Sequence, residues 1–224
     1  ASGGFISTQT KGHGVMTRGR FAAFEGGEGA GKSTQVVRIA NWLRGRGLDI
    51  VTTREPGGTP LAEQIRELLL TPREEAVHEW TELLLVFAAR AQHLHTHIVP
   101  ALERGQWVLS DRFTDASYAY QGEGRKMGAP AIATLEQLVQ GNLRPDMTLV
   151  LDLTIEQSAK RVAGRGKTKD RFEGEQNAFF QRVRQTYLRR AVDDPHRYSV
   201  IDASLELDAV TRAIMRHIEG LLPS

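Results

Sequence analysis

The residues with the clearest chemical meaning form one stretch, 26–33, which reads G-G-E-G-A-G-K-S. It matches the pattern G-x-x-x-x-G-K-[ST], in which glycines let backbone N–H groups approach phosphate oxygens without hindrance from side chains. In this pattern the lysine, Lys32, contacts the β- and γ-phosphates, and the hydroxyl of Ser33 is a ligand of Mg²⁺. The stretch predicts a site for a nucleoside triphosphate and Mg²⁺, formed by Gly26, Gly27, Glu28, Gly29, Ala30, Gly31, Lys32, Ser33 and Thr34.

The sequence around this stretch places it between a strand and a helix. The apolar run 21–24 lies directly before it, and apolar residues at helical spacing follow it between Val36 and Leu43. This order suits phosphate binding, because the first N–H groups of a helix and the positive end of its dipole attract an anion. A glycine-rich loop that only turns the chain is the alternative, and so complete a pattern in this context makes it the weaker one.

The composition is that of a soluble globular protein. The chain has 224 residues, of which 40% are hydrophobic and 25% charged, and its net charge of +2 gives no overall attraction to nucleic acid. It has no cysteine, which excludes disulfides, thiolate catalysis and cysteine-bound zinc. No apolar run approaches the roughly 20 residues that span a bilayer, and the N-terminus lacks the apolar core of a signal peptide. We therefore expect a cytoplasmic protein that binds neither membranes nor nucleic acid.

Short apolar or β-branched segments alternate with helical patterns along the chain. The expected strands are 21–24, 49–53, 107–110, 147–152 and 198–202. The expected helices include 61–70, which follows Thr59 as N-cap and Pro60, then 76–103, whose last turn Pro100 bends, and 207–221. This alternation predicts an α/β fold with a five-stranded parallel sheet flanked by helices. Ligands of such sheets bind at the carboxyl ends of the strands, so the loops after the first three strands should meet in one crevice.

The expected domain does not include the first residues. Residues 1–15 show no periodic apolar pattern, and Met16 lies just before the first expected strand, as a natural start codon would. We expect 1–15 to be an expression-tag remnant or a disordered tail, and 16–224 to form a single domain.

Two glycine-rich polar segments, 121–125 and 164–171, depart from the alternation of strands and helices. Their composition is typical of the long loops that act as lids over active sites. Phosphoryl transfer needs cations around the migrating group, and residues 26–31 contain neither arginine nor lysine. We therefore expect a basic lid at about 164–174 to supply the missing charge, a solvated charge run being the alternative. Its basic residues are Arg165, Lys167, Lys169 and Arg171.

Three arginines belong to the expected crevice or lie beside it. Arg54 follows the second strand, Arg90 lies on the long helix, and Arg112 follows the third strand. Guanidinium groups suit a second substrate that carries a phosphate, although each arginine could instead pair with a neighbouring carboxylate. A switch GTPase would need an Asn-Lys-x-Asp motif and an Asp-x-x-Gly motif after its second strand, and the sequence contains neither.

These motifs together resemble the bacterial thymidylate kinases. The resemblance covers 20–222, and T-R-E-P-G-G-T followed by F-A-A-R at this spacing is far more specific than the phosphate loop alone. It implies transfer of the γ-phosphoryl group of ATP to dTMP, giving dTDP and ADP for dTTP biosynthesis, with Mg²⁺ required and a homodimer as the assembly. The motifs that carry it are the phosphate loop with Glu28, T-R-E-P-G-G-T at 53–59, F-A-A-R-A-Q at 87–92, D-R-F at 111–113 and A-Y-Q-G at 119–122.

The resemblance also assigns the acceptor site. Arg54 and Arg112 would hold the phosphate of dTMP, Phe87 would stack on the thymine, and Arg90 would hydrogen-bond the base. A guanidinium has only donors, so it can satisfy the O4 carbonyl of thymine but would face the amino group of cytosine. Phe87 lies on an apolar helical stripe, where a role in the core is the alternative. Ser117 and Gln121 would lie beside the base, and Tyr120 would lie against the sugar. The implied dTMP site therefore comprises Glu28, Arg54, Phe87, Arg90, Arg112, Ser117, Tyr120 and Gln121.

The negative charge of Glu28 would repel the phosphates of the nucleotides unless a cation lay between them. We therefore expect Arg112 or Mg²⁺ to bridge the Glu28 carboxylate and the nucleotides. Asp111, at the end of a strand, is the expected second ligand of Mg²⁺ beside Ser33, and Asp152 is the weaker candidate. Arg165 best matches the arginine that one branch of the family carries in its lid. The implied catalytic residues are Lys32, Arg112, Arg165, Arg171 and Glu28.

Other functions are less well supported by the sequence. His93 and His97 share a helical face, but no third metal ligand and no H-E-x-x-H pattern accompanies them. A kinase for another nucleotide or for a deoxynucleoside is the nearest alternative, and Arg90 with its neighbours favours thymine on a deoxyribose. A nucleic-acid-binding ATPase would use the lid and the basic residues of 182–190, which lack interleaved aromatic residues.

Overall fold

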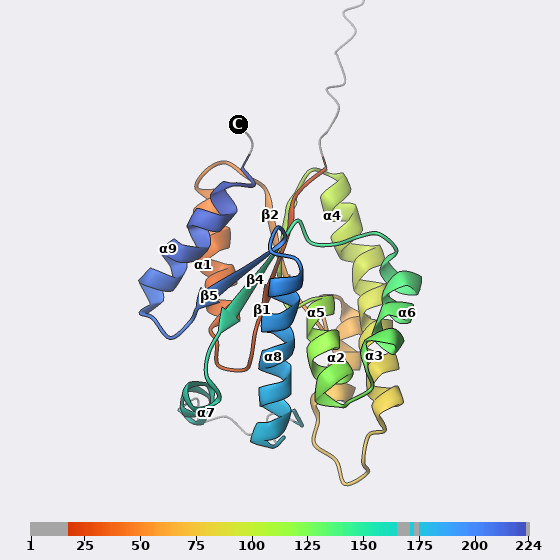
Figure 1. Cartoon of the computed structure of the whole chain (residues 1–224). Coiled ribbons are helices and arrows are strands. Elements are labelled where there is room, and N and C mark those ends of the chain that lie inside the picture. Colours follow the sequence, from red (N-terminus) through yellow and green to blue (C-terminus); the bar gives the residue numbers. More distant parts are fainter. Residues whose placement is uncertain (1–17, 165–170, 173–174, 223–224) are drawn as a thin grey trace, which may run out of the picture.

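Five parallel strands form the centre of the molecule. The computed structural model describes residues 18–164, 171–172 and 175–222, so the expected tail at 1–15 and most of the expected lid lie outside the described residues (Figure 1). The strand order is β2-β3-β1-β4-β5, which confirms the predicted parallel α/β sheet, with strand ends within one residue of the prediction. The strands are β1 (Phe21–Glu25), β2 (Ile50–Arg54), β3 (Trp107–Asp111), β4 (Met147–Asp152) and β5 (Tyr198–Asp202).

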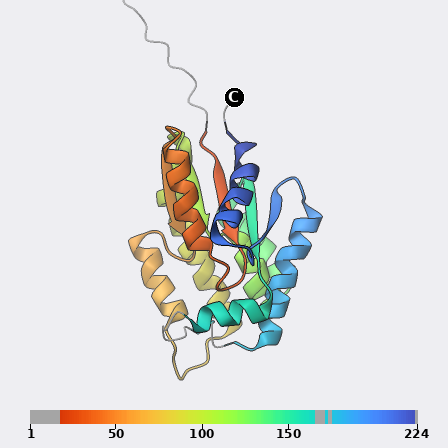
Figure 2. The same cartoon turned by 90° about the vertical axis from the view of Figure 1, so that its left-hand side faces the viewer.

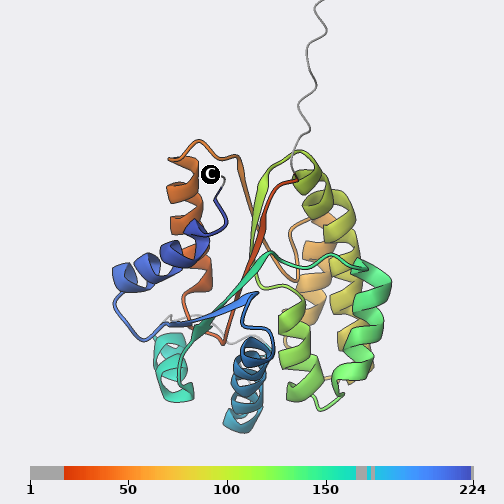
Figure 3. The same cartoon turned by 45° about the horizontal axis from the view of Figure 1, so that its top comes forward.

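Helices cover both faces of the sheet. One face packs on α1 (Lys32–Arg44) and α9 (Leu207–Glu219), which lie in front of the strands in Figure 2. The other face packs on α4 (Val99–Glu103), α8 (Asn177–Asp193) and the π-helical turn η1 (Leu94–Ile98) (Figure 3). Within the described part of the chain, no helix is both long and apolar enough to cross a membrane. The helices are α1 (Lys32–Arg44), α2 (Pro60–Leu70), α3 (Glu79–His93), η1 (Leu94–Ile98), α4 (Val99–Glu103), α5 (Thr114–Ser117), η2 (Tyr118–Gly124), α6 (Ala129–Gln140), α7 (Ile155–Ala163), α8 (Asn177–Asp193) and α9 (Leu207–Glu219).

Successive residues of β1 point to opposite faces, which divides the core into two layers. Ala22 and Phe24 pack with α1 and α9, whereas Phe21 and Ala23 pack with α4 and η1. All four are fully buried, so the strand reads as a continuous apolar run. Because both sides of β1 are covered, its carboxyl end is left as the place where a ligand can approach.

The prediction of one long helix at 76–103 is wrong about the residue at which the helix begins and about the helix being continuous. α3 begins only at Glu79, where the imidazole of His78 accepts a hydrogen bond from the N–H of Trp80 at 3.3 Å. The helix then changes to the π-helical turn η1 before α4 begins, with Pro100 in its first turn. Pro100 has no N–H to continue the regular ladder, and the wider turn before it accommodates this loss. The predicted helix 61–70 is confirmed, with Thr59 as its N-cap.

The prediction of a lid-like loop at 121–125 is also wrong. Most of this segment belongs to η2, and Gln121, Gly122 and Gly124 are buried. The glycines allow close packing: a Cβ on Gly124 would lie 2.7 Å from a ring atom of Phe179. The glycine-rich composition therefore reflects a crowded contact between η2 and α8, since a side chain at 124 would collide with that ring.

Candidate active site

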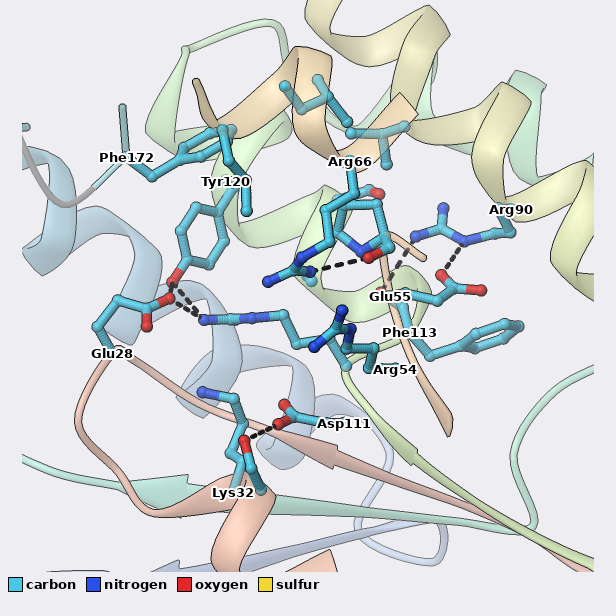
Figure 4. Close-up of a pocket in the computed structure, with 18 of the residues that line it drawn as sticks. Glu28, Lys32, Arg54, Glu55, Arg66, Arg90, Asp111, Phe113, Tyr120 and Phe172 are labelled. Atoms are coloured by element: carbon cyan, nitrogen blue, oxygen red, sulfur yellow. Dashed lines mark hydrogen bonds and ion pairs between the residues drawn. The ribbon is translucent and has the colours of Figure 1, made fainter. Parts of the chain in front are cut away.

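A cavity of about 550 Å³ opens at the carboxyl ends of β1, β2 and β3. Its lining comes from the ends of β2 and β3, from the loops after the three strands and from α1, α2, α3, α5, α7 and η2 (Figure 4). The volume is in the range of small-molecule sites. Of the predicted site residues, Gly26, Gly27, Ala30, Phe87 and Arg171 are outside the lining, and Arg165 lies outside the described residues. The predicted residues in the lining are Glu28, Gly29, Gly31, Lys32, Ser33, Thr34, Arg54, Arg90, Asp111, Arg112, Ser117, Tyr120 and Gln121.

The loop between β1 and α1 has a backbone that only glycine adopts readily. Gly26 and Gly31 have φ angles of 130° and 87°, a region in which a side chain would be strained. Lys32 begins α1, and its Nζ donates to the carbonyl oxygens of Gly26 and Gly27 at 3.1 and 2.9 Å. Burial, followed by the charge of Arg112, lowers the pKa of Lys32. The loop thus surrounds one ammonium group at the start of a helix, an arrangement suited to phosphate.

The two predicted metal ligands meet at the bottom of the cavity. The hydroxyl of Ser33 donates to the carboxylate of Asp111 at 2.5 Å, which joins the start of α1 to the end of β3. A hydroxyl and a carboxylate are oxygen ligands of the kind that Mg²⁺ prefers, so their chemistry fits this ion. Asp152 instead accepts two hydrogen bonds from Arg184, at 2.7 and 2.8 Å, and is not in the cavity lining. The described residues contain no cluster of three or more histidine or acidic side chains that could hold a metal ion.

Arg112 connects the phosphate loop to η2. Its NH1 donates to the carbonyl oxygen of Gly26 at 3.1 Å, and its NH2 donates to the Tyr120 hydroxyl at 2.9 Å and to the Glu28 carboxylate. The backbone of Arg112 has a φ of 71°, unusual for a residue with a side chain, and the Ser110 hydroxyl donates to its carbonyl oxygen at 2.6 Å. The Glu28–Arg112 ion pair lies at the cavity wall (Figure 4), and the expected bridging role of Arg112 stays a prediction.

A buried carboxyl group supports Arg112 from below. Glu25, the last residue of β1, accepts from the N–H of Phe113 at 2.7 Å and from the hydroxyl of Tyr187 at 2.8 Å. The same hydroxyl accepts from NH1 of Arg112 at 3.2 Å. Burial, reinforced by the negative charge of Asp115, raises the pKa of Glu25 to about 8. The end of β1, the loop after β3 and α8 are thereby tied together beneath the cavity.

Two further arginines reach the cavity from the side of β2 and α2 (Figure 4). Arg54 is half-exposed and donates to the carboxylate of Glu63 at 2.7 and 3.3 Å. Arg66, which the sequence did not single out, donates to the carbonyl oxygen of Pro56 at 2.8 Å. Burial, followed by the charge of Arg54, lowers the pKa of Arg66. With Arg112, these arginines give this end of the cavity an excess of positive charge.

Arg90 is fixed in a buried network of charged groups. Its Nε donates to Glu55 at 2.7 Å and its NH2 donates to the carbonyl oxygen of Phe113 at 3.2 Å. Glu55 also lies 3.1 Å from Nδ1 of His93, whose Nε2 is 2.6 Å from the Thr53 hydroxyl. Burial opposes ionisation of Glu55, but the charge of Arg90 and the contact with His93 outweigh it and hold the pKa of Glu55 below its usual value. The third nitrogen of Arg90, NH1, is buried and has no hydrogen-bond partner among the described residues.

The residue predicted to stack on a base does not reach the cavity. Phe87 is buried against Leu83 and Ile132, and the guanidinium of Arg90 lies 4.6 Å from the centre of its ring. Val86 lines the cavity instead. On a helix, residues four apart share a face more closely than residues three apart, so Val86 follows Arg90 into the cavity while Phe87 turns into the core.

Arg171 is engaged outside the cavity. Its Nε donates to the carbonyl oxygen of Leu69 at 2.9 Å, and its NH2 donates to Glu82 at 2.6 Å. Its guanidinium also lies 4.6 Å from the ring centre of Phe172, which does line the cavity. Arg171 thus contacts α2 and α3 and holds a neighbour of the site in place.

Several residues around the site carried no clear signal in the sequence. Glu55 stands inside the T-R-E-P-G-G-T motif and Glu25 directly precedes the phosphate loop, but their types gave no indication of which side chains they contact. Glu82 has the spacing of Val86 and Arg90, four residues apart along one face of α3, and this pattern could have revealed it. The missed residues are Glu25, Glu55, Arg66, Glu82, Val86, Phe113, Phe172 and Tyr187.

Comparisons with known proteins agree with one another. The sequence pattern of the thymidylate kinase family matches residues 24–214. The chain is 56% identical over 210 residues to a thymidylate kinase of Chromohalobacter salexigens, covering 93% of this chain and 99% of that protein. It is 60% identical over 204 residues to a thymidylate kinase of Pseudomonas putida, covering 91% and 97%. The crystal structure of thymidylate kinase from Ehrlichia chaffeensis superposes with a TM-score of 0.73 at 30% identity, covering 90% of this chain and 99% of that one.

Proposed function

The chain belongs to the thymidylate kinase family, and from this premise we propose how its residues divide the work of phosphoryl transfer. It is a nucleoside monophosphate kinase that transfers the γ-phosphoryl group of ATP to dTMP, forming dTDP and ADP. The main support for these assigned roles is that the phosphate loop and Arg90 line the same cavity. A phosphate loop lines one end of it, and the unpartnered NH1 of Arg90 lies at the other.

ATP would bind through the loop of residues 26–34, with Lys32 exchanging its carbonyl partners for the β- and γ-phosphates. Ser33 and Asp111 would hold Mg²⁺, an ion that bridges phosphate oxygens and neutralises the charge that develops during transfer. The short contact between these two residues brings their oxygens together without either being used elsewhere in the described core.

The phosphate of dTMP would lie between Arg54 and Arg112, with Arg66 adding charge from α2. Guanidinium groups suit this task because they can donate two parallel hydrogen bonds to phosphate oxygens. Glu28 would act through Arg112, holding the guanidinium between the phosphate loop and the acceptor. This arrangement keeps a positive group between the two nucleotide phosphates.

The thymine would lie against Val86, with its O4 on Arg90 NH1 and with Ser117 and Gln121 beside it. Arg90 suits this role because its other nitrogens are held by Glu55 and Phe113, which fixes the direction of the free donor. Tyr120 would contact the deoxyribose, since its hydroxyl is held by Arg112 near the phosphate end. A ribose 2′-hydroxyl would crowd this ring.

We test the substrate with a coupled assay of ATP and Mg²⁺ against dTMP, dUMP, dCMP, AMP and thymidine. The proposal expects dTMP to have the highest kcat/KM. Preferred turnover of AMP or thymidine would contradict the assigned acceptor site. Removal of Mg²⁺ by chelation should abolish turnover, and restoration should recover it.

We assign the missing catalytic cation to Arg165. The guanidinium of Arg171 is already held by Glu82 and the Leu69 carbonyl oxygen, and of the remaining basic lid residues Arg165, Lys167 and Lys169, Arg165 best matches the family. Arg165→Ala should lower kcat about 10³-fold while the KM for dTMP changes little, because an arginine near the migrating group acts mainly in the transition state. Arg171→Ala is the matched comparison; an unaffected kcat in Arg165→Ala would transfer the role to another lid cation.

We also propose that the chain forms a homodimer through α3. Trp80 and Leu84 are 49% and 53% exposed, four residues apart on one face of this helix, and Ala88 continues the stripe. Leu84→Glu should convert the dimer into a monomer by light scattering, whereas the exposed Leu138→Glu on α6 should not. A wild-type protein that is monomeric at assay concentrations would contradict the proposal. The cytoplasmic location stays a prediction.

The nucleic-acid-binding alternative receives little support from α8. Arg182 donates to carbonyl oxygens of η2, Arg184 pairs with Asp152, and Arg190 pairs with Asp115. These guanidinium groups serve the fold, so they do not form a free basic surface for a nucleic-acid backbone.

A further inference from the structure

Glu82 is a fully buried carboxylate directly behind the base end of the cavity. It lies on α3 at the same spacing as Val86 and Arg90, so the three residues follow one face of the helix. Glu82 itself does not line the cavity, whereas Val86, Arg90 and Gln121 do. A buried carboxylate is costly unless donors satisfy it, which makes its partners informative.

Three side chains donate to this carboxylate. Arg171 NH2 lies 2.6 Å from Oε2, and Arg125 Nε lies 3.2 and 3.3 Å from the two oxygens. These two guanidinium groups balance the negative charge. The third donor is Nε2 of Gln121, 2.8 Å from Oε1 of Glu82. Glu82 therefore joins the two arginines to the amide of a residue in the cavity lining.

The contact determines which way the amide of Gln121 faces. A carboxylate offers only acceptors, so the NH₂ group of Gln121 must be directed at Glu82. The two ends of an amide point in different directions, and Oε1 is therefore turned away from Glu82. Among the described residues no donor contacts this oxygen. A glutamine at this position, free to rotate, could present a donor or an acceptor; Glu82 leaves only the acceptor for a ligand.

We propose that Glu82 is a specificity-determining positioning residue, which holds Gln121 so that the site offers an acceptor beside the donor of Arg90. This pair of groups complements the N3–H and O4 edge of thymine. Cytosine reverses both groups, because its N3 is an acceptor and its N4 amino group is a donor. The inference rests on the proposed base end of the site and explains how its amide discriminates.

The sharpest probes are dTMP and 5-methyl-dCMP, which share the methyl group and the sugar and differ only at this edge. In Glu82→Gln, residue 82 presents both a donor and an acceptor, so the amide of Gln121 can adopt either orientation. We expect the ratio of kcat/KM for dTMP to that for 5-methyl-dCMP to fall about 10- to 100-fold, the range expected for one buried hydrogen-bond mismatch. A ratio equal to that of the wild type, even with both activities lowered, would overturn the inference.

Glu136→Gln is the matched control. Glu136 is also a buried carboxylate that accepts from a glutamine, Gln140, at 3.3 Å and pairs with an arginine, Arg144, at 2.8 Å. Neither of these partners lines the cavity. This variant should keep the wild-type ratio, and an equal fall in both variants would show that the effect is general and would overturn the inference.

A second variant keeps the test usable if Glu82→Gln does not fold. Glu82→Asp retains the charge that Arg125 and Arg171 require, but withdraws the carboxylate from Gln121 by one methylene. It should lower the same ratio to a smaller extent, and an unchanged ratio would count against the inference. The wild type separates the two proposals: failure to prefer dTMP would contradict the proposed function, whereas wild-type preference that persists in both variants contradicts only the role of Glu82.

Discussion

The two ends of the cavity are built in different ways. At the phosphate end, the groups that line the cavity come mostly from the carboxyl ends of β2 and β3, the loops after β1 and β3 and the first turn of α1, and they include backbone as well as side chains. At the base end, they come from α3 and η2, and a layer of buried carboxylates stands behind them. Glu55 directs Arg90 across 35 residues of sequence, and Glu82 directs Gln121 across 39. In the proposed site, phosphate binding would therefore depend on local backbone shape, while base recognition would depend on distant partners.

The difference also concerns exposure. The Arg54–Glu63 pair at the phosphate end has side chains that are 54% and 38% exposed, whereas the Arg90–Glu55 pair at the base end is 1% and 3% exposed. Water can replace a lost partner at the first pair but not at the second. The phosphate end should therefore tolerate loss of supporting partners, and the base end should not.

The largest effect should come from the phosphate end itself. Lys32→Met removes the ammonium group to which we assign neutralisation of the transferred phosphoryl group, so kcat should fall about 10³-fold or more. The fold should persist, because among the described residues the Nζ of Lys32 donates only to carbonyl oxygens of the adjoining loop. Steady-state kinetics and circular dichroism check both expectations. Lys126→Met, at an exposed lysine, is the control, and a kcat within tenfold of the wild type would contradict the role of Lys32.

Removing the buried Arg90–Glu55 ion pair at the base end should affect both activity and stability. Arg90→Met should lower kcat/KM for dTMP about 10²-fold, and it should cost about 3–5 kcal/mol of unfolding free energy because the buried carboxylate of Glu55 loses its guanidinium partner. The double variant Arg90→Met/Glu55→Gln should recover much of the stability in urea unfolding but not the activity. Recovery of both would show that Arg90 acts only as a structural residue.

A third change tests the support beneath Arg112. The folded-state pKa of Glu25 is raised to about 8 from 4.5, so between these values the folded state binds more protons than the unfolded state. Wild-type stability should therefore fall as the pH rises from about 5 to 8 and level off above that, with about 1.4 kcal/mol for each unit of pKa shift. Glu25→Gln cannot titrate and should lack this decline in urea unfolding at a series of pH values. Parallel profiles for the two proteins would exclude Glu25 as its source.

The smallest effect should come from the exposed edge of the phosphate end. Glu63→Gln frees Arg54 from a half-exposed ion pair and removes a negative charge near the acceptor phosphate. The KM for dTMP should fall by at most about fivefold, since exposed ion pairs are worth little. Glu67→Gln, at an exposed position on the same helix, should leave KM unchanged. An increase in KM for Glu63→Gln would mean that Glu63 positions Arg54 rather than competing for it.

The contrast between the ends explains how well the sequence predicted the site. Lys32, Ser33, Asp111 and Arg112 could be placed because they stand in motifs at the ends of strands, where the fold leaves little choice. Phe87 was placed in the cavity from its motif, yet the difference between three and four helical steps puts Val86 there instead. Composition was also insufficient to predict the structure of 121–125, because a glycine-rich segment can form either a packed π-helical turn or an exposed loop.

The amino-acid sequence by itself determined the α/β sheet, the phosphate loop and the identity of most residues that face the cavity. Short apolar runs bounded by turns and alternating with helical patterns favour buried parallel strands, and a complete glycine-lysine-serine pattern between a strand and a helix favours phosphate as the partner. Only the tertiary structure decided how Arg90 and Gln121 are oriented, because Glu55 and Glu82 approach them from remote parts of the chain. A hydrogen bond depends on the direction of donor and acceptor as well as on their types, and direction is set by packing.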